Sequence, residues 1–211
     1  MNKATHTGGE AVVETLAAAG IDTVFGIPGG HSLPIYAALH GHSKVRHVLG
    51  RHEQGLGYMA DGYARASGRM AAVTTTSGPG VANVTAALGQ ATTDNVPMVV
   101  ISSGPSAALI GRNRGGLHDL NDAIELARPA CRYVAHADAV DEISPKLAEL
   151  IRNLRCNRPG GAFLQVPTNI LGASADTVIC SSDGDRLAPD MGTVAAAAEL
   201  LQTATRPLII A

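Results

Sequence analysis

The segment Arg51–Gly68, RHEQGLGYMADGYARASG, decides the fold of this 211-residue chain. The stretch 45–49 before it is expected to form a β-strand, and the small and apolar residues that follow Glu53 predict a helix that ends at Gly68. Glu53 is therefore expected where a strand passes into a helix. A carboxylate at this position can complement the positive end of the helix dipole, or it can serve a ligand. This segment alone leaves both interpretations open.

Two further glycine-rich turns flank this segment. They are GIPGG at 26–30 and TTTSGPGVAN at 74–83, and each follows an apolar strand pattern and precedes a helical pattern. Three strand ends should therefore bring their loops to one carboxyl edge of a parallel sheet, which is where open α/β sheets bind ligands. Taken alone, GIPGG is more typical of an ordinary tight turn.

The remaining chain continues the alternation of strand and helix. It predicts an α/β fold with a doubly wound, parallel sheet of about six strands and helices on both faces. The predicted strands are 23–27, 45–49, 70–76, 97–102, 131–135 and 161–166. The predicted helices are 9–19, 32–39, 53–67, 81–90, 119–126, 142–154 and 194–201. The segment 104–117 lacks periodicity, and a loop of this length is more often functional than filler, although mobility without function is the alternative.

Composition excludes several classes of protein. Hydrophobic residues make up 45%, the net charge is −2 and aromatic residues are 3%, so we expect no nucleic-acid partner. No apolar run approaches the roughly 20 residues of a membrane span, so we expect no membrane partner. Cys131, Cys156 and Cys180 are widely spaced and lack a CxxC pair. They predict reduced thiols in a cytoplasmic protein, and neither a disulfide framework nor a metal site.

The three turn motifs together resemble a known family. GIPGG, then HEQ followed by ADGYARASG, then TSGPGVAN are similar to the pyrimidine-binding domain of thiamine diphosphate (ThDP) enzymes, in the branch of acetolactate synthases and 2-oxoacid decarboxylases. The resemblance covers about residues 8–171. It implies the N-terminal part of a lyase or carboligase that acts on 2-oxo acids. Neither GxGxxG nor GxxxxGK[ST] occurs at these turns, which disfavours a dinucleotide or nucleoside triphosphate site.

The resemblance also implies roles for individual residues. Glu53 would bond the ring nitrogen of the cofactor's aminopyrimidine and so favour the imino tautomer that acts as the internal base. Gly30 would leave room for substrate. His31 stands where synthases of this family tend to have a small residue, and it is a candidate second acid or base near the substrate. A solvent-exposed histidine at a helix start is the favoured alternative for His31. His52 is expected to pack against the sheet. The other cofactor-binding positions would be Ile27, Pro28, Gly29, Thr76, Pro79 and Asn83.

Two other departures from the family pattern narrow the expected activity. Ser102–Gly104 stands where pyruvate decarboxylases carry a histidine pair, which disfavours that subfamily. The segment 109–122, LIGRNRGGLHDLND, lacks the Phe-Gln-Glu of acetolactate synthases, which weakens the case for pyruvate as substrate. The choice between decarboxylation and carboligation stays open. The alternative function is a non-catalytic ligand-binding or dimerisation module that retains the fold, and Glu53 favours the enzyme.

The chain is expected to contain three parts. Residues 1–171 form the pyrimidine-binding domain, 172–190 a linker and 191–211 the start of a middle domain. The apolar segment 207–211 predicts a strand that simply stops, which indicates the N-terminal part of a longer enzyme. The resemblance places the diphosphate and Mg²⁺ site in a later domain and allows FAD in the middle domain. It also implies a homodimer or homotetramer through the helices that start at Glu53 and Val81. This piece alone is expected to bind ThDP weakly or not at all.

Overall fold

A computed structural model describes residues 4–184 and 188–210. Its main feature is a sheet of six strands in which every neighbouring pair is parallel. The strands are β2 (Thr23–Gly26), β3 (Arg46–Leu49), β4 (Ala71–Thr75), β5 (Met98–Gly104), β6 (Tyr133–His136) and β7 (Gly161–Pro167). Their order across the sheet is β3-β2-β4-β5-β7-β6. The predicted doubly wound α/β fold is therefore confirmed.

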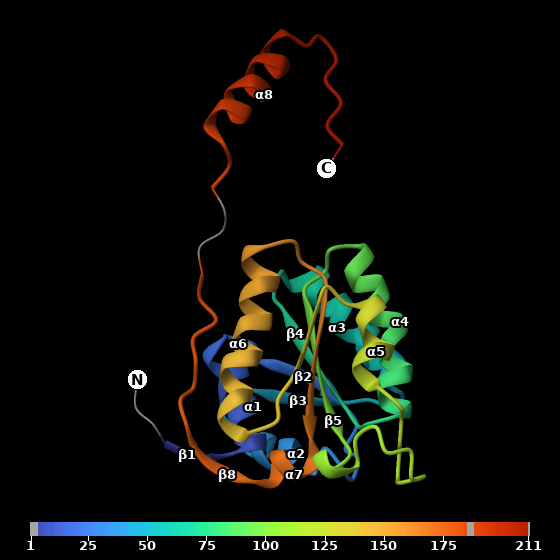
Figure 1. Cartoon of the computed structure of the whole chain (residues 1–211). Helices are drawn as coiled ribbons and strands as arrows, with labels where there is room; N and C mark the ends of the chain where they lie inside the picture. The colour runs from blue at the N-terminus through green and yellow to red at the C-terminus, as the bar shows by residue number, and fades with distance from the viewer. Residues whose placement is uncertain (1–3, 185–187, 211) are drawn as a thin grey trace.

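Helices cover both faces of this sheet (Figure 1). They are α1 (Gly8–Ala18), α2 (Leu33–Leu39), α3 (Glu53–Ser67), α4 (Pro79–Thr93), α5 (Ala123–Ala127) and α6 (Val140–Cys156), with 3₁₀ turns η1 (Ala107–Leu109) and η2 (Arg128–Ala130). The core on one face joins α1, α2 and α6, and the core on the other joins α3, α4 and α5. Ala72 faces the first core, whereas its neighbours Ala71 and Val73 face the second. Strands buried on both faces explain the uniformly apolar sequence patterns.

The strand order reverses direction between β2 and β4. The chain leaves β2 toward the edge strand β3 and then returns to form β4 on the other side of β2. The register pairs Gly26 at the end of β2 with both Leu49 and Thr74. The loops after these three strands therefore leave the sheet side by side, and a crevice at such a reversal is the usual ligand site of open α/β sheets.

A short second sheet joins the start of the chain to residues after the main sheet. Strand β1 (Ala4–Thr7) pairs antiparallel with β8 (Ser174–Thr177), and helix α7 (Thr168–Gly172) precedes β8. The segment 172–190 was predicted to be a linker, and the structure places strand β8 within its first part. The polar sequence SADT of β8 shows no apolar periodicity, so its pairing could not be anticipated.

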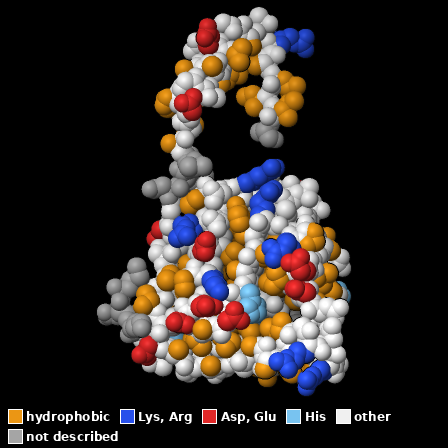
Figure 2. All heavy atoms as spheres, viewed as in Figure 1, with side chains coloured by type: hydrophobic (Ala, Val, Ile, Leu, Met, Phe, Trp, Pro, Cys, Tyr) orange, Lys and Arg blue, Asp and Glu red, His pale blue; other side chains and the backbone are white. Residues whose placement is uncertain are grey.

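The last described residues form helix α8 (Met191–Thr203), which has no buried residues. The helix stands apart from the sheet in Figure 1, and hydrophobic side chains gather on it and on the segment after it (Figure 2). The predicted strand at 207–211 is wrong for residues 207–210, which pair with no other strand among the described residues. Ala211 lies outside the described residues. Apolar content alone does not form a strand, because its backbone groups need a partner.

Candidate ligand site at the reversal of the sheet

Glu53 is the first residue of α3, as the sequence predicted. His52 caps this helix, because its Nδ1 accepts a hydrogen bond from the Gln54 amide at 3.2 Å. The expectation that His52 packs against the sheet is wrong, since its side chain is exposed. Gly68 ends the helix with φ +69°, a conformation that favours glycine. The strand-to-helix junction thus places a half-buried carboxylate at the carboxyl edge of the sheet.

The third turn brings α4 against this carboxylate. Asn83, in the first turns of α4, donates a hydrogen bond from Nδ2 to Glu53 Oε2 at 2.9 Å. A Cβ at Gly80 would lie 3.5 Å from Glu53 Oε1, so the backbone of α4 approaches the other carboxylate oxygen closely. Among the hydrogen bonds of the described residues, none involves Oε1. One oxygen of Glu53 is therefore fixed by protein, and the other is available to a ligand.

Close packing of α3 on α4 holds these two helix starts together. A Cβ at Gly57 would lie 2.4 Å from the Ala87 Cβ, a distance that real side chains do not reach. Leu56 and Val84 are fully buried beside this contact. Because protein interiors are close-packed, a side chain at position 57 would push the helices apart. Gly57 within RHEQGLGYMADGYARASG therefore has a packing role.

The first turn reaches the third through Gly29. A Cβ at Gly29 would lie 2.9 Å from Thr76 Cβ, so the two loops touch. Ile27 packs against the core that contains α3 and α4. Pro28, Gly30 and Pro79 are exposed at the same edge of the sheet. All three predicted turns thus meet around the reversal of the sheet, although their contacts with a cofactor stay predictions.

His31 is held in a polar cluster beside this edge. Its Nδ1 lies 2.7 Å from Ser77 Oγ, and its ring meets the ring of His118 edge-to-face at a centroid distance of 6.1 Å. Thr168 Oγ1 donates to the His31 carbonyl oxygen at 3.1 Å. The favoured reading of His31 as a solvent-exposed histidine is therefore wrong. Burial lowers the pKa of the His31 imidazole, and the nearby His118 lowers it further, so His31 favours the neutral form.

His118 was noted in the sequence but given no role. Its Nδ1 lies 3.4 Å from Thr76 Oγ1, and its carbonyl oxygen would lie 2.5 Å from a Cβ at Gly78. Gly78 has φ +62° and precedes α4, so both the conformation and the contact require glycine there. In the sequence, only the position of His118 directly after the aperiodic segment 104–117 could have indicated a functional role. Its contact with the third turn is visible only in the structure.

Tyr36 on α2 is a second residue that sequence reasoning missed. Its hydroxyl would lie 2.3 Å from a Cβ at Gly26, and it has no hydrogen-bond partner among the described residues. Burial raises the pKa of the Tyr36 phenol, and the negative charge of Glu53 raises it further. The neutral phenol therefore lies within electrostatic reach of Glu53, beneath the first turn. The sequence gives no indication of this contact, because an aromatic residue in a short predicted helix is typical of ordinary core packing.

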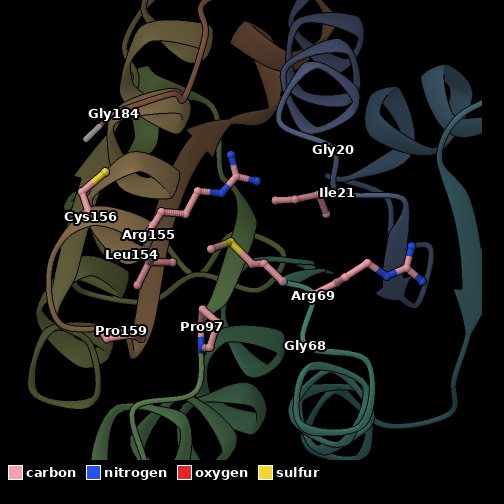
Figure 3. A pocket seen from close by; sticks show the side chains of 11 residues that line it. Gly20, Ile21, Gly68, Arg69, Pro97, Leu154, Arg155, Cys156, Pro159 and Gly184 are labelled. Atoms are coloured by element: carbon pink, nitrogen blue, oxygen red, sulfur yellow. The ribbon is translucent and has the colours of Figure 1, made fainter. Parts of the chain in front are cut away.

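A larger hollow lies at the opposite, amino edge of the sheet. It has a volume of about 450 Å³ and is bounded by residues that precede four strands, including Ile21, Met70 and Pro97. Figure 3 shows Arg155 extending from α6 toward Gly20 and Ile21. Its guanidinium donates to the Ala19 carbonyl oxygen and, at 2.9 Å, to Ser182 Oγ. The charged groups here already bond to protein.

The fold and the carboxyl-edge geometry define a class: a doubly wound α/β domain that binds a ligand at its topological switch point. A comparison with protein families then identifies it. Residues 6–126 match the family described as "Thiamine pyrophosphate enzyme, N-terminal TPP binding domain". The chain belongs to the thiamine pyrophosphate enzymes, so the resemblance seen in the three turn motifs is confirmed.

Curated relatives of this chain include two kinds of enzyme. "Probable 2-ketoarginine decarboxylase AruI" of Pseudomonas aeruginosa is 41% identical over 98% of this chain and 37% of its own length. The mitochondrial acetolactate synthase catalytic subunit of Saccharomyces cerevisiae is 36% identical over 79% of this chain and 24% of its own length. The acetolactate synthase of Mycobacterium bovis is 37% identical over 78% of this chain and 26% of its own length. The chain therefore spans 37% or less of these relatives.

The described residues were also compared with the requirements of a membrane span, a metal site and a disulfide. Within the described ranges no helix is both long and apolar enough to cross a membrane. The same residues contain no group of three or more His, Cys, Asp or Glu side chains that could hold a metal ion. The three cysteines are free thiols.

Proposed function

We propose that this chain provides the pyrimidine-binding part of the active site in a ThDP-dependent decarboxylase or carboligase that acts on a 2-oxo acid. One observation carries the proposal. Glu53 stands at the switch point with Oε2 bonded to Asn83 at 2.9 Å, while Oε1 has no bond among those of the described residues. A carboxylate fixed in this way can share a proton with a ring nitrogen of a bound heterocycle.

The residues around Glu53 fit the aminopyrimidine of that cofactor. Gly29 and Gly80 leave no space for side chains of their own, because a Cβ at either would contact Thr76 within 3.1 Å. Because Gly29 and Gly80 have no side chains, a flat ring could approach their backbone beside the Ile27 side chain. When bound, ThDP would supply an acidic thiazolium carbon as the nucleophile and the thiazolium ring as the electron sink. Glu53 would hold the pyrimidine proton, and Asn83 would orient Glu53.

Among the two reactions, we favour decarboxylation. The relative named as a 2-ketoarginine decarboxylase aligns with 98% of the chain, whereas the yeast acetolactate synthase aligns with 79%. Decarboxylation converts a 2-oxo acid and one proton into an aldehyde and CO₂. His31, half-buried beside Ser77 and His118, would supply or relay that proton from the substrate side, next to Gly30. The alternative of a non-catalytic module gives no reason for the ordered Glu53–Asn83 pair.

Several properties of the intact protein belong to the same proposal. The diphosphate and its Mg²⁺ would be bound outside this chain, and FAD would bind, if at all, outside residues 1–171. Tyr58 and Met59 on α3 are 43% and 46% exposed, which supports a homodimer or homotetramer through α3 and α4. Exposed apolar residues on α8 support residues 191–211 as the start of another domain. Free thiols support a reducing cytoplasm.

Replacing Glu53 by Gln in the intact protein tests the proposal. We expect turnover to fall by roughly 100- to 10,000-fold, because Gln cannot share a proton with the ring nitrogen. Hydrogen–deuterium exchange at the thiazolium C2, followed by NMR, should slow as well. Glu125→Gln is the matched control, because Glu125 lies in the first turn of α5 and its carboxylate accepts a hydrogen bond only from Arg128 among the described residues. Unchanged exchange in Glu53→Gln would contradict the assignment.

A further inference from the structure

A cavity at the carboxyl edge of the sheet is lined in part by His31. Its volume is about 250 Å³, which is the volume that roughly eight molecules occupy in liquid water. Pro105, Leu109 and Leu117 give it apolar walls, and Arg114 and Asp119 are the charged residues that line it. We call it the side cavity. An apolar cavity with few polar groups is the usual form of a small-molecule site.

His31 connects the lining of the side cavity to the third turn. His31 lines the cavity and also bonds Ser77, which directly follows Thr76 in the third turn. Thr168 lines the cavity as well and bonds the His31 backbone at 3.1 Å. A substrate that reacts near Gly30 and Glu53 can therefore extend its substituent past His31 into the side cavity.

Asp119 gives the side cavity a negative charge with no protein partner. Its side chain is half-buried, and no hydrogen bond or ion pair of this carboxylate occurs within residues 4–184 and 188–210. Its backbone amide bonds the Gly116 carbonyl oxygen at 3.1 Å, which orders the loop. Residue 119 was predicted to be helical, but α5 begins only at Ala123, after the cap Asp122. A partly desolvated carboxylate gains most from a cationic partner.

Arg114 brings a positive charge to the same cavity and so opposes the effect of Asp119. It lines the same cavity, and its positive charge would favour an anionic substituent. Arg114 is exposed, however, whereas Asp119 is half-buried. Solvent and salt screen an exposed charge more strongly than a buried one, so Asp119 should dominate the potential inside the cavity.

We propose that the side cavity binds the side chain of the 2-oxo acid and that Asp119 selects substrates whose side chain is an alkyl chain ending in a guanidinium or ammonium group. This inference rests on the proposed function, because it describes the substrate of the same site. Apolar walls suit the methylene groups of such a chain, and the carboxylate suits its charged end. Asp119 is thereby a specificity-determining residue and takes no part in cofactor activation.

The test uses three 2-oxo acids of similar length with the intact protein, ThDP and Mg²⁺. Their side chains end in a guanidino group, a neutral ureido group of nearly the same shape, and a carboxylate. We expect kcat/KM to be highest for the guanidino compound. Asp119→Asn should lower kcat/KM for this compound by roughly 10- to 100-fold and should change the ureido value by less than about threefold. Asp119→Glu should keep part of the preference.

Asp122→Asn is the matched control. It removes a negative charge three residues away but keeps a good capping side chain for α5, so the preference for the guanidino compound should persist. An unchanged preference in Asp119→Asn, or a wild-type preference for the anionic compound, would overturn the inference. Failure of the proposed function would appear differently, as C2 exchange that does not depend on Glu53.

Binding without turnover provides an independent readout. Calorimetry would compare 5-guanidinopentanoate with 5-ureidopentanoate, which lack the reactive 2-oxo group. We expect the wild-type protein to bind the guanidino acid at least about tenfold more tightly, and Asp119→Asn to remove most of that difference. Equal binding of the two acids by the wild-type protein would contradict the role of Asp119.

Discussion

The two edges of the sheet contain different kinds of hollow. At the amino edge, the hollow of about 450 Å³ is bounded by guanidinium groups that already have protein partners, such as the pairs Arg69–Asp22 and Arg155–Ser182. At the carboxyl edge, the side cavity is smaller, about 250 Å³. There Glu53 Oε1 and the Asp119 carboxylate have no partners among the described residues.

This difference teaches that unpaired polar groups indicate a site better than volume does. A polar group that loses water on folding and finds no protein partner lowers the stability of the fold. Such a group is therefore expected to bind a ligand or to act in catalysis. The switch point places such groups on the carboxyl edge, because three loops converge there. At the amino edge the same fold can satisfy its charges with neighbouring backbone and side chains.

The largest expected contrast compares two asparagines at opposite edges. Asn83→Ala should lower turnover of the intact enzyme by roughly 10- to 100-fold, because the charged Glu53 loses its hydrogen bond. At the amino edge, Asn95 accepts hydrogen bonds from Arg132 and Arg158 and has φ +57°. Asn95→Gly preserves this backbone conformation and should leave turnover within about twofold. Steady-state kinetics of both variants check the contrast, and equal losses would remove the functional distinction between the edges.

A second prediction concerns the packing that holds the carboxyl edge together. Gly57→Ala should lower the free energy of unfolding of this chain by about 1–3 kcal/mol, because the new Cβ overlaps Ala87. Gly62→Ala is the control on the same helix, since its Cβ would meet nothing within 4 Å. It should raise the free energy of unfolding by up to about 1 kcal/mol. Urea denaturation measures both, and a stable Gly57→Ala would show that α3 and α4 can separate.

A third prediction follows from the lowered pKa of His31. The unfolded histidine titrates near 6.5, and burial disfavours the charged form in the folded chain. His31 therefore lowers stability as the pH falls from above 6.5 toward its folded pKa, and it has no such effect at higher pH. NMR titration should give a midpoint below 6.5. The fall in stability between pH 7.5 and 5.5 should be smaller in His31→Asn, and a midpoint above 6.5 would contradict the burial of this ring.

The smallest expected effect lies at the amino edge. Arg69 is paired with Asp22, but its side chain is 57% exposed. Exposed ion pairs contribute little, so Arg69→Gln should lower the free energy of unfolding by at most about 1 kcal/mol and leave turnover unchanged. Thermal or chemical denaturation with a parallel activity assay checks this. A large loss of activity would indicate a ligand site at the amino edge.

Local patterns predicted most of the fold because they depend on short stretches of chain. The predicted strands 97–102 and 161–166 match β5 and β7, and each end agrees to within two residues. The short strand β1, its partner β8 and the isolated residues 207–210 escaped prediction or were mispredicted. Their state depends on whether a distant segment supplies hydrogen bonds, and a local pattern does not contain that information.

The sequence by itself determined the family, the doubly wound sheet and the place of Glu53 at a strand-to-helix junction, because glycine turns and apolar periodicity act over a few neighbouring residues. Only the tertiary structure decided that Asn83 bonds Glu53, that His31 meets Ser77 and His118, and that Asp119 lines a cavity beside them. The side-chain contacts among them join residues 30 to 87 positions apart. They exist because parallel strands in a reversed order bring separate loops to one edge of the sheet.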